Sequence, residues 1–451
     1  MPKIMFRSTN RKAPLVSFKE ALLKGQAPDY GLYMPEVIPK LTKEEIESFR
    51  NKKYYEIAFE IVKRFVGDEI DDKNLKELCK NAYNFDVPLE KVGDSLYVMR
   101  LDRGPTASFK DFAARLMARL MSYFAKQENK SLHVLVATSG DTGGAVADAF
   151  YNVENIKVTV LFPEKEVTGR QRKQMTTLGK NITAIAVKGK FDDCQALVKR
   201  AFNDPALKDF NLTSANSINF GRLMPQIVYY IYAYSRLGRD KIIFSVPSGN
   251  FGDLMGGIFA KEMGLPIEKF IVAVNENDEF PNFLKTGNYT PVVPSRECTS
   301  NAMNVGHPSN LARLIDLYGG LLVDERDEKG KVIRQGILKE KPNMEKLRKD
   351  FVSFSITNKE VDETIKNVYE RYKIILEPHG AVGFAAVEKA KLNGLVVSLE
   401  TADPAKFPEE IKKVIGINPK VPKSLARLDD KKEKFETISN AYEEFKKILK
   451  K

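Results

Sequence analysis

The stretch from Lys241 to Asp253 reads KIIFSVPSGNFGD and decides the fold class. It begins with a short, mainly apolar run, and the glycine-containing turn PSGNFGD follows at once. A helical stretch then extends from Leu254 to about Met263, where the sequence Gly-Leu-Pro at 264–266 ends it. An apolar strand that leads through a glycine turn into a helix is typical of a parallel sheet with helices on both faces.

The same order recurs along the chain. The run LHVLVA at 132–137 precedes the turn TSGDTGG at 138–144, and an alanine-rich helical stretch follows at 145–150. Further buried strands are predicted from apolar runs at 158–162, 270–274 and 394–399. Between Leu41 and Tyr83, periodic apolar residues among charged ones predict amphipathic helices. The sequence therefore predicts an α/β protein built on parallel sheets, with a mostly helical N-terminal segment.

Composition excludes several classes of protein. The chain has 451 residues, of which 43% are hydrophobic and 29% charged, and this is typical of a globular protein rather than a disordered one. No apolar run reaches the roughly 18 residues of a membrane span. The first residues lack the apolar core of a signal peptide. We therefore expect a cytoplasmic protein without a membrane partner.

Cysteine, histidine and charge patterns narrow the choice further. Three cysteines and three histidines lie far apart, so we expect neither a disulfide framework nor a metal site. The formal net charge is +12, but lysines alternate with acidic residues, as in DDKKEK at 429–434. This pattern favours a solvated surface over a nucleic-acid interface.

One lysine lies at an unusual position. Residues 104–112 read GPTASFKDF, and a helical stretch follows from Ala113 to about Met121. Lys110 thus lies at a helix N-terminus, where a positive charge opposes the helix dipole. One interpretation is a nucleophilic lysine with a lowered pKa that forms a Schiff base. The alternative is an ordinary surface lysine.

Two glycine-containing loops are candidate anion sites. SGNFGD at 248–253 and TSGDTG at 138–143 both lie between a predicted strand and a helix N-terminus, which favours an anion. Neither is a Walker A or GxGxxG motif. The alternatives are a glycine needed only for a tight turn and an ordinary helix cap. Together with Lys110, and without metal ligands or a histidine-based triad, the loops indicate a phosphorylated carbonyl cofactor, for which pyridoxal phosphate fits.

Several motifs, in their order along the chain, resemble the threonine synthase family. They are GPTASFKDF at 104–112, the segment 137–143, NSIN at 216–219, the segment 245–253, EPHGAV at 377–382 and TADPAKF at 401–407. VSFKEA at 16–21 and GLYMP at 31–35 resemble the opening segment of that family. The resemblance covers about residues 15–425. It implies pyridoxal 5'-phosphate as cofactor and the fold type II architecture, with two parallel-sheet α/β domains.

The resemblance also implies roles for individual residues. Lys110 would form the Schiff base, and Thr401 would hydrogen-bond the pyridine nitrogen, leaving it largely unprotonated. The cofactor phosphate would be bound by Gly249, Asn250, Phe251 and Gly252, with Asp253 adjoining. The substrate amino acid would contact Ser139, Asp141 and Thr142. Candidates for the substrate phosphate are Thr168, Lys173 and Asn216.

The implied activity is that of a carbon–oxygen lyase acting on phosphates. It converts O-phospho-L-homoserine and water to L-threonine and phosphate by γ-elimination and β-replacement. We expect a monomer or homodimer with an N-terminal helical domain at 1–95, a large cofactor domain at 96–125 and 236–451, and a small mobile domain at 126–235.

Three positions depart from the family pattern. Asp102-Arg103 precedes Gly-Pro-Thr where the family commonly has Phe-His, Thr168 replaces a frequent serine, and Asp403 stands where a histidine can occur. The Asp102-Arg103 departure keeps open a related pyridoxal-phosphate lyase that yields a 2-oxo acid, ammonia and phosphate. A rival from another class is a non-catalytic protein of this fold that binds nucleic acid through its basic surface.

Overall fold

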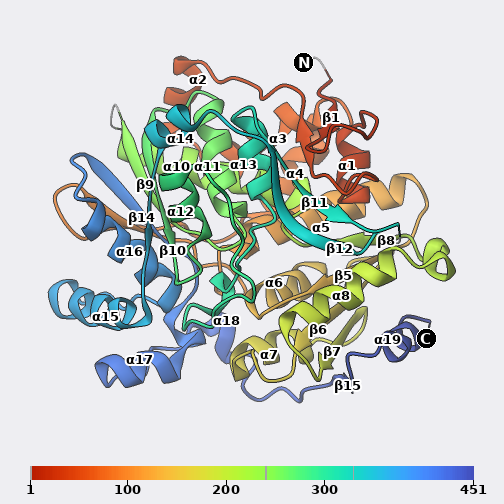
Figure 1. Ribbon diagram of the computed structural model, residues 1–451. Helices are drawn as coiled ribbons and strands as arrows, with labels where there is room; N and C mark the ends of the chain where they lie inside the picture. The colour runs from red at the N-terminus through yellow and green to blue at the C-terminus, as the bar shows by residue number, and fades with distance from the viewer. Residues whose placement is uncertain (1–2, 239–240, 329, 451) are drawn as a thin grey trace.

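Two parallel-strand sheets organise the molecule in the computed structural model, which describes residues 3–238, 241–328 and 330–450 (Figure 1). The larger sheet has six strands in the order β13-β10-β9-β14-β4-β3. Neighbouring strands are parallel except β3, which pairs antiparallel with β4. The strands are β3 (Leu89–Lys91), β4 (Leu96–Arg100), β9 (Ile242–Pro247), β10 (Ile267–Val274), β13 (Phe351–Ser355) and β14 (Leu395–Glu400).

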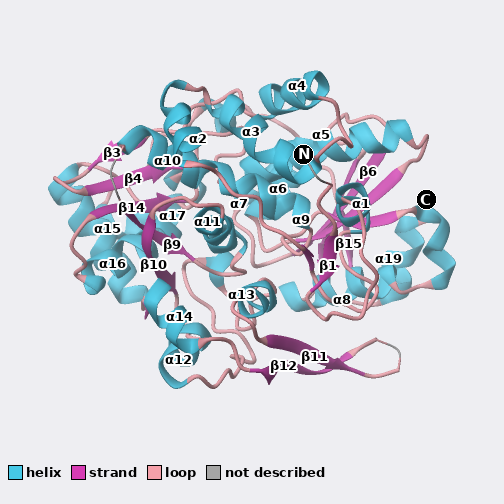
Figure 2. Ribbon diagram, turned by 90° about the horizontal axis from the view of Figure 1, so that it is seen from above, coloured by secondary structure: helices cyan, strands magenta, loops and turns pink. Residues whose placement is uncertain are grey.

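The smaller sheet has five strands in the order β15-β7-β6-β5-β8, and all neighbours are parallel. Its strands are β5 (Leu132–Ala137), β6 (Ile156–Pro163), β7 (Ile182–Val187), β8 (Leu212–Ser214) and β15 (Glu436–Ile438). Two antiparallel pairs complete the strands: β1 (Phe6–Ser8) with β2 (Tyr33–Pro35), and β11 (Leu321–Arg326) with β12 (Val332–Glu340). The β11–β12 pair lies at the edge of the molecule (Figure 2).

Both faces of each sheet are buried, because alternate residues of the apolar strands enter different cores. In β10, Phe270 and Val272 belong to one buried cluster, whereas Ile271 and Ala273 belong to another. In β5, Val134 belongs to the first cluster and Leu135 to a third. Side chains of successive strand residues point to opposite faces, so a continuous apolar run needs cover on both sides. The predicted α/β class with parallel sheets is confirmed.

Helices supply that cover and form the N-terminal region. The N-terminal helices are α1 (Phe18–Lys24), α2 (Lys43–Ser48), α3 (Tyr54–Val66) and α4 (Asp72–Ala82). The helices up to β10 are α5 (Lys110–Gln127), α6 (Asp141–Phe150), α7 (Gly169–Thr176), α8 (Phe191–Phe202), α9 (Phe220–Leu223), α10 (Ile227–Leu237) and α11 (Gly252–Glu262). The later helices are α12 (Glu279–Thr286), α13 (Leu311–Leu317), α14 (Met344–Asp350), α15 (Asn358–Tyr372), α16 (Pro378–Ala390), α17 (Pro408–Ile415), α18 (Lys423–Ala426) and α19 (Tyr442–Leu449). Short 3₁₀ turns include η4 (Asn301–Met303) and η5 (Pro404–Lys406).

The C-terminal segment lies with the smaller sheet, and this corrects the expected domain division. β15 pairs with β7, and Phe445 of α19 packs into the core beneath the smaller sheet. The assignment of all of 236–451 to the large domain is therefore wrong for residues 436–449. Figures 1 and 2 show the C-terminus beside the small sheet.

An ion pair links strand ends of the two sheets, because Asp141 follows β5 of the smaller sheet and Lys406 follows β14 of the larger one. Within the larger sheet's part, the isolated bridge between Ser108 and Ala402 joins the segment before α5 to the segment after β14. Ligands of parallel α/β sheets bind at the carboxyl ends of the strands.

In the described parts of the chain, no helix combines the length and apolar character needed to cross a membrane.

Candidate active site

Lys110 is the first residue of α5, and polar contacts hold the loop before it. The Asp111 carboxylate accepts hydrogen bonds from the Thr106 backbone N–H at 2.8 Å and from its hydroxyl at 2.6 Å. A Cβ at Gly104 would lie 2.3 Å from Asp111 Oδ2, so a larger residue there would displace the carboxylate. The Phe109 N–H donates to the Thr401 carbonyl at 2.8 Å. The loop is thereby fixed to the end of β14.

The Lys110 amine lies in an environment that favours its neutral form. Burial lowers the pKa of Lys110 to about 8; the charges of Lys406 and Arg222 act in the same direction, while Asp141 and Glu377 oppose them. Within the described residues, no hydrogen bond or ion pair occupies the amine, whose nearest ring is Phe109 at 4.4 Å from its centroid. A lysine with these properties can act as a nucleophile or as a general base.

The loop at 248–253 presents free backbone donors at the N-terminus of α11. Among the described residues, no acceptor bonds the N–H groups of residues 249–254. Phe251 has a φ of +60°, which turns the chain tightly into the helix. The Asn250 carbonyl and side chain are held from behind, by the Asn310 amide at 3.0 Å and the Ser309 N–H at 3.2 Å. This geometry suits an anion such as phosphate.

The Asp253 side chain faces a different direction. Its Oδ1 accepts hydrogen bonds from the Tyr229 hydroxyl at 2.5 Å and from the Tyr230 hydroxyl at 2.7 Å, both in α10. Burial raises the pKa of Asp253 to about 6. The carboxylate therefore anchors α11 to α10, and only the Asp253 backbone N–H is placed to serve an anion.

The loop at 138–143 forms a second set of donors. The Thr138 hydroxyl accepts hydrogen bonds from the Gly140 N–H at 3.0 Å and the Gly143 N–H at 2.9 Å. In the described part of the chain, the N–H groups of Ser139, Asp141 and Thr142 have no acceptor. Asn216 lies beside this loop, because its amide donates to the Ala137 carbonyl at 3.0 Å.

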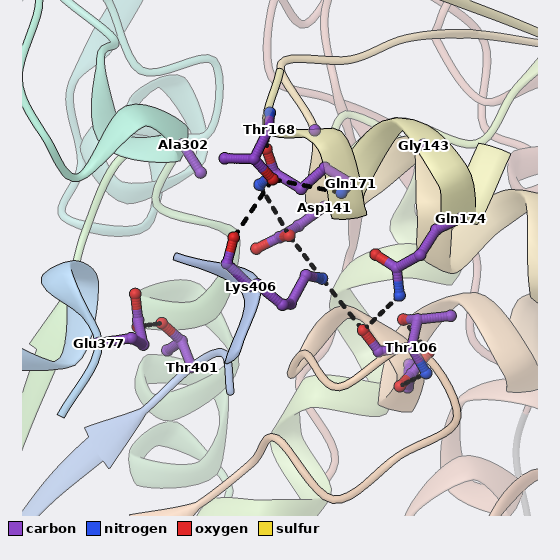
Figure 3. Close-up of polar contacts among 12 residues, drawn as sticks. Thr106, Asp141, Gly143, Thr168, Gln171, Gln174, Ala302, Glu377, Thr401 and Lys406 are labelled. Atoms are coloured by element: carbon purple, nitrogen blue, oxygen red, sulfur yellow. Dashed lines mark hydrogen bonds and ion pairs between the residues drawn. The ribbon is translucent and has the colours of Figure 1, made fainter. Parts of the chain in front are cut away.

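A buried ion pair joins this second loop to the Lys110 loop (Figure 3). The Lys406 amine, fully buried, lies 2.6 Å from Asp141 Oδ1 and donates to the Thr106 carbonyl at 3.0 Å. Burial alone would raise the pKa of Asp141, but the charges of Lys406 and Lys110 outweigh it and hold that pKa below its usual value. Asp141, which follows β5 of the smaller sheet, is therefore a carboxylate paired with Lys406, which follows β14 of the larger sheet.

Helix α7 is tied to the same network. Gln171 donates to Asp141 Oδ1 at 3.0 Å, and Gln174 donates to the Thr106 carbonyl at 2.8 Å. The Thr168 hydroxyl donates to the Lys406 carbonyl at 3.2 Å and caps α7 through the Gln171 N–H. Lys173, in contrast, donates to the Asp429 carbonyl at 2.6 Å on the exposed side of α7. The structure thus brings Thr168 to the network but directs Lys173 toward the C-terminal segment.

The Thr401 hydroxyl is hydrogen-bonded to a buried carboxylate, that of Glu377. Its hydroxyl donates to Glu377 Oε1 at 3.2 Å. Glu377 Oε2 accepts from the ring Nδ1 of His379 at 2.5 Å, and the His379 Nε2 accepts from the Ala302 N–H at 3.0 Å. Because Nε2 is an acceptor, the ring is neutral with its proton on Nδ1. These hydrogen bonds hold Thr401 beside the Lys110 loop.

Comparisons with known proteins agree along the whole chain. Family models match as "Threonine synthase N terminus" at residues 5–83, "Pyridoxal-phosphate dependent enzyme" at 83–401 and "Threonine synthase, C-terminal" at 380–449. The chain is 37% identical to threonine synthase of Pseudomonas aeruginosa, covering 96% of this chain and 95% of that protein. It is also 37% identical to the Escherichia coli enzyme, covering 92% of each. The chain belongs to the threonine synthase family.

Solved structures support the same assignment. A pyridoxal-phosphate-bound threonine synthase from Brucella melitensis superposes with a TM-score of 0.91, at 35% identity, over 99% of this chain and 98% of that one. The yeast threonine synthase superposes with a TM-score of 0.90, at 33% identity and the same coverage. The expected fold type II architecture and the cofactor pyridoxal phosphate are confirmed for this member of the threonine synthase family.

The residues present fit that cofactor. A lysine amine with a pKa of about 8 suits bonding to an aldehyde, and the free N–H groups of residues 249–252 suit a phosphate. Gly249 packs closely against η4, because a Cβ there would lie 3.0 Å from the Ala302 carbonyl oxygen and would require the backbone to shift by a few tenths of an ångström.

Sequence reasoning missed three residues of this site. Lys406, Glu377 and His379 are buried and directly bonded to predicted site residues. Lys406 and Glu377 lie inside the quoted motifs TADPAKF and EPHGAV. The available signal for Lys406 was a lysine within TADPAKF, a motif whose other residues, apart from Asp403, are apolar or small.

The Asp102-Arg103 departure has a structural basis. Asp102 is buried and pairs with Arg100, with Nε to Oδ1 at 3.2 Å. The Arg103 side chain is exposed and lies 3.6 Å from Glu90 Oε1. Asp403 accepts from the Ala405 N–H at 2.9 Å and so caps the turn that carries Lys406. Asp403 thus supports the turn around Lys406, whereas Asp102 and Arg103 pair with residues of β4 and β3.

Proposed function

We propose that this chain converts O-phospho-L-homoserine and water to L-threonine and phosphate at the site formed by Lys110 and the two glycine loops. The observation that carries the proposal is the position of Lys110. It is the first residue of α5, no hydrogen bond or ion pair among the described residues occupies its amine, and the Lys406–Asp141 ion pair, which bonds the Thr106 carbonyl, joins its loop to the second glycine loop. Burial, which lowers the pKa of this lysine to about 8, supports the same role. One loop supplies donors for the cofactor phosphate, and the other supplies donors for the substrate.

Residues 249–252 would hold the phosphate of pyridoxal phosphate, and Lys110 would bind its aldehyde carbon. Thr401 would donate to the ring nitrogen after its hydroxyl, which has a single proton, turns away from Glu377. When bound, the cofactor supplies an electron sink for negative charge at the substrate Cα. Every proton transfer is left to the side chains of the chain and to the departing phosphate.

Lys110 is the residue placed to move protons. The substrate amine would displace Lys110 from the cofactor, and the freed, neutral Lys110 amine would take the proton from Cα. A further proton would be lost from Cβ before the Cγ–O bond to phosphate breaks. Protonation of Cγ gives the methyl group, the oxygen of water adds to Cβ, and a proton returns to Cα. The net change is one water consumed, and one threonine and one phosphate formed.

The second loop would position the substrate. The free N–H groups of Ser139, Asp141 and Thr142 suit the substrate carboxylate at the N-terminus of α6. Thr168 and Asn216 lie at the same end of the small sheet and are the better candidates for the substrate phosphate. Lys173 would reach it only after leaving the Asp429 carbonyl.

Closure of the small sheet on the large one would keep bulk water from the reacting carbons. The Asp141–Lys406 ion pair and the Thr168–Lys406 hydrogen bond connect the two parts across the site. Without such closure, early hydrolysis would release 2-oxobutyrate. The smaller sheet and its helices, from β5 to β8 (132–214) with residues 436–449, form the unit we expect to move. The end of the expected small-domain segment 126–235 stays with the large sheet, because Tyr229 and Tyr230 of α10 bond Asp253 of α11 and Tyr230 packs against Phe244.

The test is a product analysis. Purified protein is incubated with pyridoxal phosphate and O-phospho-L-homoserine, and ¹H and ³¹P NMR follow the amino acid and the phosphate. Threonine and phosphate in equal amounts are expected. Phosphate with 2-oxobutyrate and ammonia would instead identify the related lyase, and no phosphate release would overturn the substrate.

We further propose that the enzyme works in the cytoplasm, as a monomer or homodimer without a nucleic-acid partner. All three cysteines are buried free thiols, which suits a reducing compartment. Sedimentation of the purified protein distinguishes monomer from dimer, and cell fractionation tests the compartment.

A further inference from the structure

Arg313, in α13, is a fully buried cation whose hydrogen bonds all end on neutral groups. Its Nε donates to the Tyr33 carbonyl at 3.2 Å, and its Nη2 donates to the Ile218 carbonyl at 2.6 Å. Its Nη1 donates to Asn310 Oδ1 at 2.5 Å and to the Ser217 carbonyl at 3.3 Å. The guanidinium is therefore well bonded but not neutralised.

No carboxylate among the described residues forms an ion pair with Arg313. Burial lowers its pKa, and no neighbouring charge contributes to the shift. The buried Arg64 and Arg100 differ, because they pair with Glu45 and Asp102. A buried charge without a counter-ion costs stability, so its retention needs another explanation.

Arg313 lies directly behind the loop at 248–253. Asn310, which accepts from its guanidinium, donates its own amide to the Asn250 carbonyl at 3.0 Å. A Cβ on Gly252 would lie 3.7 Å from the Asn310 amide nitrogen and 3.4 Å from the Ser217 Cβ. The Asn310 side chain thus lies between the Arg313 guanidinium, which has no counter-ion among the described residues, and the free N–H groups of the loop at 248–253.

We propose that Arg313 is a positioning residue whose charge is balanced by the phosphate group bound at residues 249–252. This rests on the proposed function, which assigns that loop to the cofactor phosphate. In a low-dielectric interior, a charge one side chain away still acts strongly on a dianion. Arg313 therefore makes the loop selective for a phosphorylated ligand, and it also holds the segments at Tyr33, Ser217 and Ile218 in place.

The test compares two ligands that differ only in the phosphate. Dissociation constants of pyridoxal and pyridoxal 5'-phosphate are measured with cofactor-free protein by absorbance and fluorescence, at constant ionic strength. Their ratio isolates the phosphate contribution. Arg313→Gln removes the charge and should narrow the ratio at least about tenfold. Arg313→Lys keeps the charge but loses most hydrogen bonds, and it should stay within about threefold of the original ratio.

Arg115 offers a matched control. It is 9% exposed, and its hydrogen bonds within the described part of the chain also end on neutral groups, the Asn81 and Ala82 carbonyls and the Asn84 side chain at the end of α4. Arg115→Gln removes a buried charge far from the loop in the hydrogen-bond network. It should lower thermal stability and leave the ligand ratio unchanged.

The outcomes separate this inference from the proposed function. If the unmodified protein binds both ligands equally, the loop does not bind phosphate and both fail. If it prefers the phosphorylated ligand and Arg313→Gln preserves the ratio, only the role of Arg313 fails. Equal losses in Arg313→Gln and Arg313→Lys would also overturn it, because the hydrogen bonds and not the charge would then matter.

A second variant covers the case in which Arg313→Gln does not fold. Asn310→Asp places a carboxylate at the atom that lies 2.5 Å from the guanidinium and gives Arg313 a permanent counter-ion. We expect the ligand ratio to narrow by about tenfold or more. An unchanged ratio in a folded Asn310→Asp protein would contradict the proposal.

Discussion

The loops at 138–143 and 248–253 have the same construction but differ in how charge is balanced. Each follows a parallel strand, opens a helix and leaves backbone N–H groups free. Behind the first loop, the buried Lys406 has Asp141 as a counter-ion at 2.6 Å. Behind the second, the buried Arg313 has no counter-ion among the residues that the structure describes, and the Asp253 carboxylate accepts hydrogen bonds from two tyrosines.

The difference teaches what each loop is built to bind. A loop whose charges are already paired keeps its shape without a ligand and offers neutral donors, which suits a substrate that comes and goes. A loop backed by an unpaired cation favours an anion that stays bound, as a cofactor phosphate does. The charges of Asp141 and Lys406, behind the first loop, act on Lys110. Lys110 also lies next to Thr401 at the end of β14, because the Phe109 N–H donates to the Thr401 carbonyl.

The largest effect is expected from Lys110→Ala, which removes the group that the two loops serve. The absorbance of lysine-bound cofactor should disappear, and turnover should fall by at least about a thousandfold. Lys126→Ala is the matched control, because Lys126 lies in the same helix but is exposed and forms a surface ion pair with Glu154 at 2.8 Å. Turnover retained in Lys110→Ala would exclude the proposed role of this lysine.

Breaking the paired loop should be costly to stability. Asp141→Asn leaves the fully buried Lys406 without a counter-ion, and we expect the free energy of unfolding to fall by about 3–5 kcal/mol. Urea denaturation measures the change. Asp141→Asn combined with Lys406→Met removes both charges and should recover most of the stability, but not the activity. A loss below about 1 kcal/mol in the single variant would show that the ion pair is not buried as described.

The pH dependence of cofactor uptake tests the environment of Lys110. Protonated amine is not nucleophilic, and burial lowers the pKa of Lys110 to about 8. The rate at which cofactor-free protein takes up pyridoxal phosphate should rise with pH up to about 8 and then level off. Stopped-flow absorbance between pH 6 and 10 gives the profile. A rate that still rises steeply above pH 9 would indicate an ordinary lysine.

The smallest expected effect is that of Thr401→Ala. The variant loses the hydroxyl that donates to Glu377, and we expect turnover to fall by about tenfold with cofactor occupancy nearly unchanged. Thr401→Ser keeps the hydroxyl and should retain most of the rate. Undiminished turnover in Thr401→Ala would remove the proposed role of Thr401, and loss of cofactor in both variants would point to packing instead.

Local patterns in the sequence predict the strand–loop–helix units well, because apolar runs and glycine turns act over a few residues. The partners of the loops come from distant segments, and no local pattern reveals them. Lys406 donates to the carbonyl of Thr106, which lies 300 residues earlier. Arg313 of α13 donates hydrogen bonds to the carbonyls of Tyr33 and Ile218, and no pattern in the sequence of α13 indicates these contacts.

Some features were hidden for other physical reasons. β15 is a three-residue strand, Glu-Thr-Ile, in a polar stretch, so its sequence carries no apolar signal. The direction of the Asp253 side chain depends on two tyrosines of α10. Thr168 and Lys173 are close in sequence, but helical geometry places one at the cap and the other on the exposed side of α7.

The most direct test of the account is to find which lysine carries the cofactor. Two lysines of the site, the half-buried Lys110 and the fully buried Lys406, are close enough for their charges to interact. The holoenzyme is reduced with borohydride and digested, and mass spectrometry locates the added pyridoxyl group. The account predicts that the group lies on the peptide that contains Lys110. A pyridoxyl group on Lys406 would contradict it, because the ion pair with Asp141 would then not exist in the holoenzyme.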